Sequence, residues 1–231
     1  MIARALVLVL LSTAPAMAAE RKLYVSSFDR VRVQGPYEVR IATGSPGGTV
    51  TGDRDVIDAL EVRVEGSSLV VRGGISKWED TPRTRSGAPV VVTLTTPTLA
   101  SGSVAGGGRL TIAQMKAPRV DLSVTGTGAI AVTTVEADAA NATLVGDGAI
   151  TLAGRAGKAR LMTNGGGTID AGGLEAGDLI VRVDGLGTTR ARARYTAQVA
   201  NTGLGRIDVA GSPKCIVKSD AGGPVTCGTG Q

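Results

Sequence analysis

The sequence contains no histidine, which excludes the Ser-His-Asp and Cys-His arrangements of nucleophilic hydrolases. Aromatic residues are also scarce, with one Trp, three Tyr and one Phe in 231 residues. Nucleic acid is not an expected partner, because there are few rings to stack on bases and the net charge of +5 is diffuse. A core made of small aliphatic side chains must be thin, and thin cores are typical of stacked repeats.

The sequence has only two cysteines, Cys215 and Cys227, near its C-terminus. A zinc site needs more ligands than this chain offers, and we expect no metal and no cofactor. In an oxidising compartment the two cysteines are expected to form one disulfide. A redox-active pair is the alternative, but the Cys-x-x-Cys spacing is missing.

Long hydrophobic runs are confined to residues 1–18, MIARALVLVLLSTAPAMA. This stretch has an early positive charge at Arg4, a short apolar run and a small-x-small ending at Ala16-Met17-Ala18, as in a signal peptide cleaved after Ala18. The run is too short to span a bilayer, and no second one follows, so no transmembrane segment is expected. We expect an exported protein, either periplasmic or extracellular and at the cell surface.

Glycine, by contrast, is abundant and periodic. A Gly-x-Gly-x-aliphatic pattern begins at residues 106, 126, 146, 165, 185 and 203, with a weaker copy at 221, so the steps are 20, 20, 19, 20, 18 and 18 residues. Glycine permits the positive φ of a tight corner. Its regular return makes a phosphate-binding loop at Gly146-Asp147-Gly148 the weaker interpretation and indicates a repeated architecture.

Apolar residues stand at fixed offsets from the first glycine of each copy and alternate with polar ones, as in strands with one buried face. The column four residues after the glycine contains Leu110, Ile130, Ile150, Ile169, Thr189, Ile207 and Val225. The column six residues after it contains Ile112, Val132, Leu152, Ala171, Ala191, Val209 and Cys227. The column four residues before it contains Leu122, Ala142, Leu161, Val181, Val199 and Val217.

Two strands and a glycine bend in every 18–20 residues leave no room for crossover helices. The predicted fold is therefore all-β: a right-handed, single-stranded parallel β-helix, or β-solenoid, with coils about 4.8 Å apart. We expect residues 19–231 to form one such domain. Within it, residues 19–96 supply N-terminal strands and a cap, and residues 97–231 supply the Gly-x-Gly coils.

The N-terminal part alternates strictly in residues 28–44 and 60–74 but lacks the Gly-x-Gly bend. Residues 51–60, TGDRDVIDAL, are expected to form a turn or a single helical turn. Asp53, Asp55 and Asp58 are interpreted as solvated turn acids in preference to metal ligands. Calcium is also disfavoured at residues 165–170, GGGTID, because calcium-binding glycine-aspartate repeats recur every nine residues and this one occurs once.

Stacking would align Asp170, Arg190 and Asp208, each five residues after a reference glycine, as an acid-base-acid ladder on the outside of consecutive coils. Such a ladder could bind a saccharide, but a purely structural ladder of surface ion pairs is the preferred interpretation. Arg190, Arg192 and Arg194 of the RARAR stretch should project to one side of a strand, either to contact an anionic envelope polymer or simply to face solvent.

The polar stretch of residues 74–89, GISKWEDTPRTRSGAP, contains the single tryptophan, Trp78. An aromatic side chain in a polar loop on a rigid scaffold is a candidate contact for a sugar or a protein partner. The alternative is a hydrophobic lid over the first coils. Both interpretations remain open from the sequence.

Three stretches followed by serial Gly-x-Gly coils carry a family resemblance: FDRVRVQGPYEVRIATG (28–44), the Gly52-Asp53 link to LEVRVEGSSLVV, and APVVVTLTTPTL (88–99). Over residues 23–227 the chain resembles the "putative auto-transporter adhesin, head GIN domain" family of exported bacterial proteins. The resemblance implies a β-helix-like fold and an envelope or surface setting. It implies no catalytic residues.

The function expected from the sequence is that of a non-enzymatic binding or structural module of the cell envelope, adhesin-like, whose partner is an envelope polysaccharide or a surface protein. The alternative is a carbohydrate-active β-helix enzyme, a polysaccharide lyase or hydrolase, that uses outward carboxylates such as Asp170 and Asp208.

Overall fold

A computed structural model describes residues 19–74 and 90–229 of the chain, so the predicted signal peptide and Trp78 lie outside the described residues. The described part is an all-β solenoid with one short helix, α1 (Arg54–Ala59). The strands are β1 (Ala19–Leu23), β2 (Arg30–Gln34), β3 (Glu38–Thr43), β4 (Gly47–Gly52), β5 (Leu60–Glu65), β6 (Ser68–Gly73), β7 (Val91–Thr96), β8 (Ser101–Ala105), β9 (Arg109–Lys116), β10 (Arg119–Thr125), β11 (Ala129–Val145), β12 (Ala149–Gly165), β13 (Thr168–Gly185), β14 (Thr188–Asn201), β15 (Arg206–Gly211), β16 (Lys214–Ser219) and β17 (Val225–Thr229).

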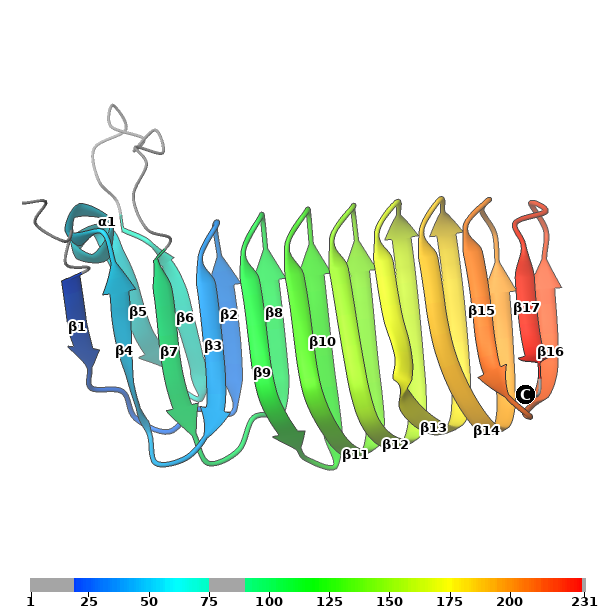
Figure 1. The fold of residues 1–231 in the computed structure, drawn as a ribbon, viewed down its shortest axis with the longest axis horizontal. Coiled ribbons are helices and arrows are strands. Elements are labelled where there is room, and N and C mark those ends of the chain that lie inside the picture. The colour runs from blue at the N-terminus through cyan, green and yellow to red at the C-terminus, as the bar shows by residue number, and fades with distance from the viewer. Residues whose placement is uncertain (1–18, 75–89, 230–231) are drawn as a thin grey trace, which may run out of the picture.

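The coils stack side by side into a flattened tube (Figure 1). One side, which we call the first side, contains β8, β10, the second halves of β11–β14, and β16; the second side contains β9, the first halves of β11–β14, β15 and β17. Glycine bends join the two sides along one edge. Along the opposite edge β11–β14 run through the corner as continuous strands, so each spans parts of two coils.

The predicted apolar columns are confirmed. Parallel pairing places Ile130 beside Ile150 and Ile150 beside Ile169, and these side chains are at most 1% exposed. The column before the bends is equally continuous, because Leu122 pairs with Ala142, and the pairing continues coil by coil to Val217. The repeat therefore sets both the strand register and the composition of the core.

The N-terminal coil is placed out of sequence order. Strands β2 and β3 pair in parallel with β6 and β7 on one flank and with β8 and β9 on the other. The coil formed by β6 and β7 therefore lies nearer the N-terminal end of the stack than the coil formed by β2 and β3, although β6 and β7 come later in the chain (Figure 1). This arrangement inserts an early segment between two later ones and links residues far apart in sequence.

Antiparallel strands cover the N-terminal end of the stack. β4 pairs with β7, β1 pairs with β4, and β5 pairs with β6, each in antiparallel register. Residues 54–59 form the single helical turn that the sequence predicted, and the Asp53 side chain caps it by accepting a hydrogen bond from the Asp55 N–H at 2.9 Å. Ile57 of this turn is buried and closes the core at this end.

The few polar side chains inside the tube are paired. The hydroxyls of Thr163 and Thr189 lie 3.1 Å apart across the core, and Asn201 donates to the Gly205 carbonyl at 2.7 Å. Thr96 donates to the Phe28 carbonyl at 2.6 Å. The polar groups in the core are therefore satisfied by partners within the core.

Candidate binding surface

The predicted ladder of Asp170, Arg190 and Asp208 exists in register, since each residue pairs directly with the next on consecutive coils of the second side. Its ion pairs are different from those expected of a ladder. Asp208 pairs with Arg206 at 2.9 Å, and Asp170 accepts a hydrogen bond from the Gly172 N–H at 3.1 Å. Within residues 19–74 and 90–229, no ion pair joins Arg190 to either aspartate.

The hydrogen bond from Arg206 holds the pKa of the Asp208 carboxyl below its usual range. A general acid in glycoside cleavage needs the opposite, a carboxyl whose pKa is raised so that it carries a proton at neutral pH. Asp208 is therefore suited to an ionised, structural role on this ladder.

Arg190, Arg192 and Arg194 all point outward from β14 and are exposed. Arg194 makes two contacts. It forms an ion pair with Glu175 at 3.0 Å, and its guanidinium carbon lies 5.9 Å from the centre of the Tyr195 ring. Arg192 lies in register with Glu175 on the neighbouring coil. Two of these three arginines thus face the same carboxylate.

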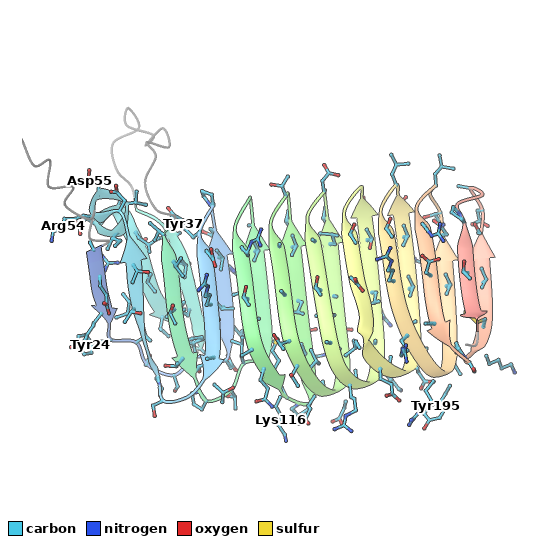
Figure 2. The ribbon with its side chains drawn as sticks, viewed as in Figure 1. Tyr24, Tyr37, Arg54, Asp55, Lys116 and Tyr195 are labelled. Carbon is cyan, nitrogen blue, oxygen red and sulfur yellow. A yellow bond between two sulfur atoms is a disulfide. The ribbon has the colours of Figure 1, made fainter. Side chains whose placement is uncertain are left out.

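A second line of charges, not predicted from the sequence, follows the edge opposite the glycine bends, where Figure 2 labels Lys116 and Tyr195. We call it the corner ladder. Glu136 pairs with Lys116 at 2.9 Å and with Arg155 at 3.7 Å, and Arg155 lies in register with Glu175, which pairs with Arg194. Signs alternate from coil to coil, so each carboxylate lies between two cations. The signal was present in the sequence as charges recurring about every 20 residues.

The corner ladder predicts a pH-dependent contribution to stability. Lys116 lowers the pKa of the Glu136 carboxyl by hydrogen bonding and by its charge, and Arg155 adds to this. A folded-state pKa below the unfolded value of about 4.3 means that the stabilisation is present at neutral pH and is lost as the pH falls through the folded pKa. We expect Glu136→Gln to lower the melting temperature slightly at pH 7 and to leave it unchanged in strong acid.

Melting curves followed by circular dichroism from pH 7 down to pH values below the carboxyl range would measure this difference. Glu65→Gln is the matched control, because Glu65 is exposed and forms no ion pair among the described residues. A Glu136→Gln difference that grows toward acid pH would contradict the assignment.

The outer face of the first side is hollowed near its C-terminal end. We call this hollow the cationic groove; its lining side chains come from β12, β13, β14 and β16 and are Arg160, Met162, Ile180, Arg182, Gln198, Ala200, Ile216 and Lys218. Two outward rows form it. Arg160, Ile180, Gln198 and Ile216 make one row, and Met162, Arg182, Ala200 and Lys218 make the other.

The groove is lined by both cationic and aliphatic side chains. Ala200 lies between Arg182 and Lys218 in its row, and its short side chain leaves space between these two long cations. The apolar side chains are unusually open for a folded protein: Ile180 is 38% exposed and Ile216 is 55% exposed. The groove thus combines positive charge with aliphatic surface.

The cations of the groove lack acidic partners. Arg160, Arg182 and Lys218 are exposed, and none takes part in an ion pair within the part of the chain that the structure describes. By contrast, most charges of the corner ladder are neutralised by their neighbours. The sequence did not predict the groove, because the repeated apolar columns mark inward positions and the groove is made of the outward residues between them.

In residues 19–74 and 90–229, no helix has the length and apolar composition needed to cross a membrane. The same residues hold no group of three or more His, Cys, Asp or Glu side chains placed to bind a metal ion.

The solved structures with a similar fold include the following three, whose identities to this chain establish the fold alone. A putative adhesin from Bacteroides fragilis NCTC 9343 has a TM-score of 0.82 at 22% identity, covering 91% of this chain and 97% of that chain. A putative adhesin from Parabacteroides merdae ATCC 43184 has a TM-score of 0.71 at 16% identity, covering 92% and 96%. A putative lipid binding protein from Parabacteroides distasonis ATCC 8503 has a TM-score of 0.69 at 18% identity, covering 92% and 97%. No curated protein matches the chain in sequence.

The family described as "Putative auto-transporter adhesin, head GIN domain" matches residues 27–213. These residues run from the inserted N-terminal coil through β15 and so include most of the solenoid. The resemblance inferred from the residues is confirmed: the chain belongs to the putative auto-transporter adhesin, head GIN domain family.

Proposed function

We propose that the protein is a non-enzymatic binding module of the cell envelope that holds an anionic envelope polysaccharide in the cationic groove. Membership of the family indicates a surface or exported protein. The signal peptide expected in residues 1–18 would deliver it there. The observation that carries the proposal is the set of three cations without acidic partners around the hollow at Ala200.

The shape of the groove favours a polymer over a compact ligand. Its lining residues extend along the solenoid axis over the coils of β12, β13, β14 and β16. Arg182 and Lys218 are two coils apart, which at about 4.8 Å per coil places their backbones roughly 10 Å from each other. Carboxylate, phosphate or sulfate groups spaced along a polymer can be held by both cations, and the aliphatic side chains can pack against sugar rings.

The outward carboxylates support a binding role over polysaccharide cleavage. Asp208 is ion-paired with a lowered pKa, and Asp170 is engaged by the backbone at Gly172. A hydrolase of this type needs one protonated carboxyl as acid beside one ionised carboxyl. Incubation of the protein with uronate-containing polysaccharides should therefore release no new reducing ends.

We expect the purified protein to bind acidic polysaccharides on a glycan array and to bind neutral ones weakly. Arg182→Gln and Lys218→Gln should each weaken binding by about tenfold to a hundredfold, because each removes a charge-assisted hydrogen bond worth roughly 1.5–3 kcal/mol. Their melting temperatures should stay the same, since both side chains are exposed. Rising salt should weaken binding by the wild-type protein more than binding by either variant.

Lys158→Gln is the matched control, because Lys158 is exposed on the same side but does not line the groove. Equal binding of neutral and acidic polysaccharides, or equal loss in the control variant, would contradict the proposal. One structural neighbour is described as a putative lipid binding protein, so vesicles with and without anionic lipid form the second arm. Binding to anionic vesicles without binding to acidic polysaccharides would reassign the groove to lipid.

A further inference from the structure

The two ends of the solenoid differ in how far other strands cover them. At the N-terminal end, β1, β4, β5 and α1 lie over the first coils. At the other end, β16 pairs only with β14, and β17 pairs only with β15, among residues 19–74 and 90–229. The last coil in Figure 1 therefore presents two strand edges that no described strand covers.

The core is also open at this end. Val217 continues the inward column of Val181 and Val199, which are 0% and 2% exposed, yet Val217 is 45% exposed. On the opposite arm, Val225 is only partly buried. An unpaired strand edge next to exposed apolar side chains is a template for pairing with another chain.

We propose that this end is a self-association surface, on which a second copy of the chain docks tail to tail. A twofold axis would pair β16 with β16 of the second copy in antiparallel orientation and extend the hydrogen-bonded ladder across the joint. The two surfaces share β16, because Ile216 and Lys218 also line the cationic groove, but the inference does not depend on the proposed ligand.

The side-chain pattern of β16 selects one register. With Val217 on the axis, Lys214 lies opposite Asp220 of the second copy, and Ile216 lies opposite its Lys218. Shifting the centre to Ile216 places Lys214 opposite Lys218, and shifting it to Lys218 places two lysines face to face. Opposite charges directly across a strand pair stabilise it and like charges destabilise it, so the register centred on Val217 is favoured.

The same register closes the core. Cys215 and Cys227 face each other across the last coil, where the disulfide joins them. Val217 and Val225 lie two residues nearer the bend on their respective arms, so they oppose each other as well. A twofold axis near this pair brings together four valines, two from each copy, and removes their exposed apolar surface from water.

The test uses light scattering coupled to size exclusion, and sedimentation equilibrium, on the full chain under oxidising conditions. We expect a reversible dimer. Lys214→Asp and Asp220→Lys should each weaken dimerisation by about tenfold or more, because each places like charges at two symmetric positions. The double variant exchanges the charges of both members of each pair and should restore the wild-type dissociation constant.

Lys158→Asp is the matched control, because Lys158 occupies the same outward column three coils earlier and is far from the joint. It should leave dimerisation unchanged. A protein that stays monomeric up to high micromolar concentration would overturn the proposal. So would a dimer that tolerates both single charge reversals, or a double variant that dimerises no better than the single ones.

Discussion

Replacing Gly148 with alanine is expected to lower the free energy of unfolding by about 3 kcal/mol, the upper part of the range for overpacked sites. For a domain of this size this corresponds to a fall of roughly 6–12 °C in melting temperature. No charge or catalytic group is involved. The whole effect comes from one methyl group placed between two coils.

The physical reason is the distance between stacked bends. A Cβ atom added at Gly148 would lie 2.7 Å from Cγ1 of Val124 and still closer to the Gly128 carbonyl oxygen. That carbonyl cannot turn away, because it accepts the backbone hydrogen bond of Ala149 at 3.0 Å. The same clash recurs at the second glycine of the next bend, Gly167, whose added Cβ would meet the Gly148 carbonyl.

The two glycines of the bend at residues 146–148 are needed for partly different reasons, although an added Cβ at Gly146 would also meet the Gly126 carbonyl oxygen, at 2.7 Å. Gly146 has a φ of +109°, a conformation that an L-residue adopts only with strain. Gly148 is not among the residues with positive φ, and its requirement comes only from the coil beneath it. A short stretch of sequence that contained one bend would not reveal the second requirement, since the obstructing atom belongs to another coil.

Gly107→Ala is the matched control for Gly148→Ala. Gly107 lies in the middle of the first bend, has no positive φ, and an added Cβ would meet only Thr127 Oγ1 at 3.6 Å. Thermal melts of both variants should show a large fall for Gly148→Ala and almost none for Gly107→Ala. Similar falls in melting temperature in the two variants would contradict this explanation. They would mean that the bends exclude side chains for a reason other than the close stacking of the coils.

The repeat made the Gly-x-Gly coils from β9 to β17 predictable. Steps of 18 to 20 residues preserve the alternation within each arm, and the pairing of Ile130, Ile150 and Ile169 follows from it. The corner is less regular, and the register shifts there between Val132 and Val135 and again between Ala171 and Glu175. Charges at the corner therefore vary by one residue in their offset from the glycines, and their sign alternates from coil to coil, so no column of one residue type marks the corner ladder in the sequence.

The position of β2 and β3 could not be predicted from the sequence. Val31 and Val33 alternate with polar residues in the same way as inward positions of any other coil, and alternation does not specify which neighbour a strand pairs with. The choice is made by tertiary packing, with β6 on one flank and β8 on the other. The cationic groove was also beyond prediction, because it depends on which outward rows lie beside each other and on the small size of Ala200.

Removing the disulfide is the second change with a large expected effect, and its effect should be local. We expect the double variant Cys215→Ser and Cys227→Ser to lose about 3 kcal/mol of local stability in the last coil, following the chain-entropy model for a short loop. Coils of a solenoid contact only their neighbours, so stability is lost one coil at a time from an end. In the monomer, strands β16 and β17 are each paired on a single flank and are the first to open.

Hydrogen exchange read by mass spectrometry resolves where the loss occurs. Amides of residues 214–219 and 225–229 should exchange about a hundredfold faster in the variant, as a 3 kcal/mol change implies, whereas amides of β11 and β12 should keep their rates. Reduction of the wild-type protein provides a control without new side chains and should give the same pattern. Faster exchange in every coil would mean that the stack unfolds as one unit. Unchanged exchange in the last coil would mean that pairing with β14 and β15 alone holds it closed.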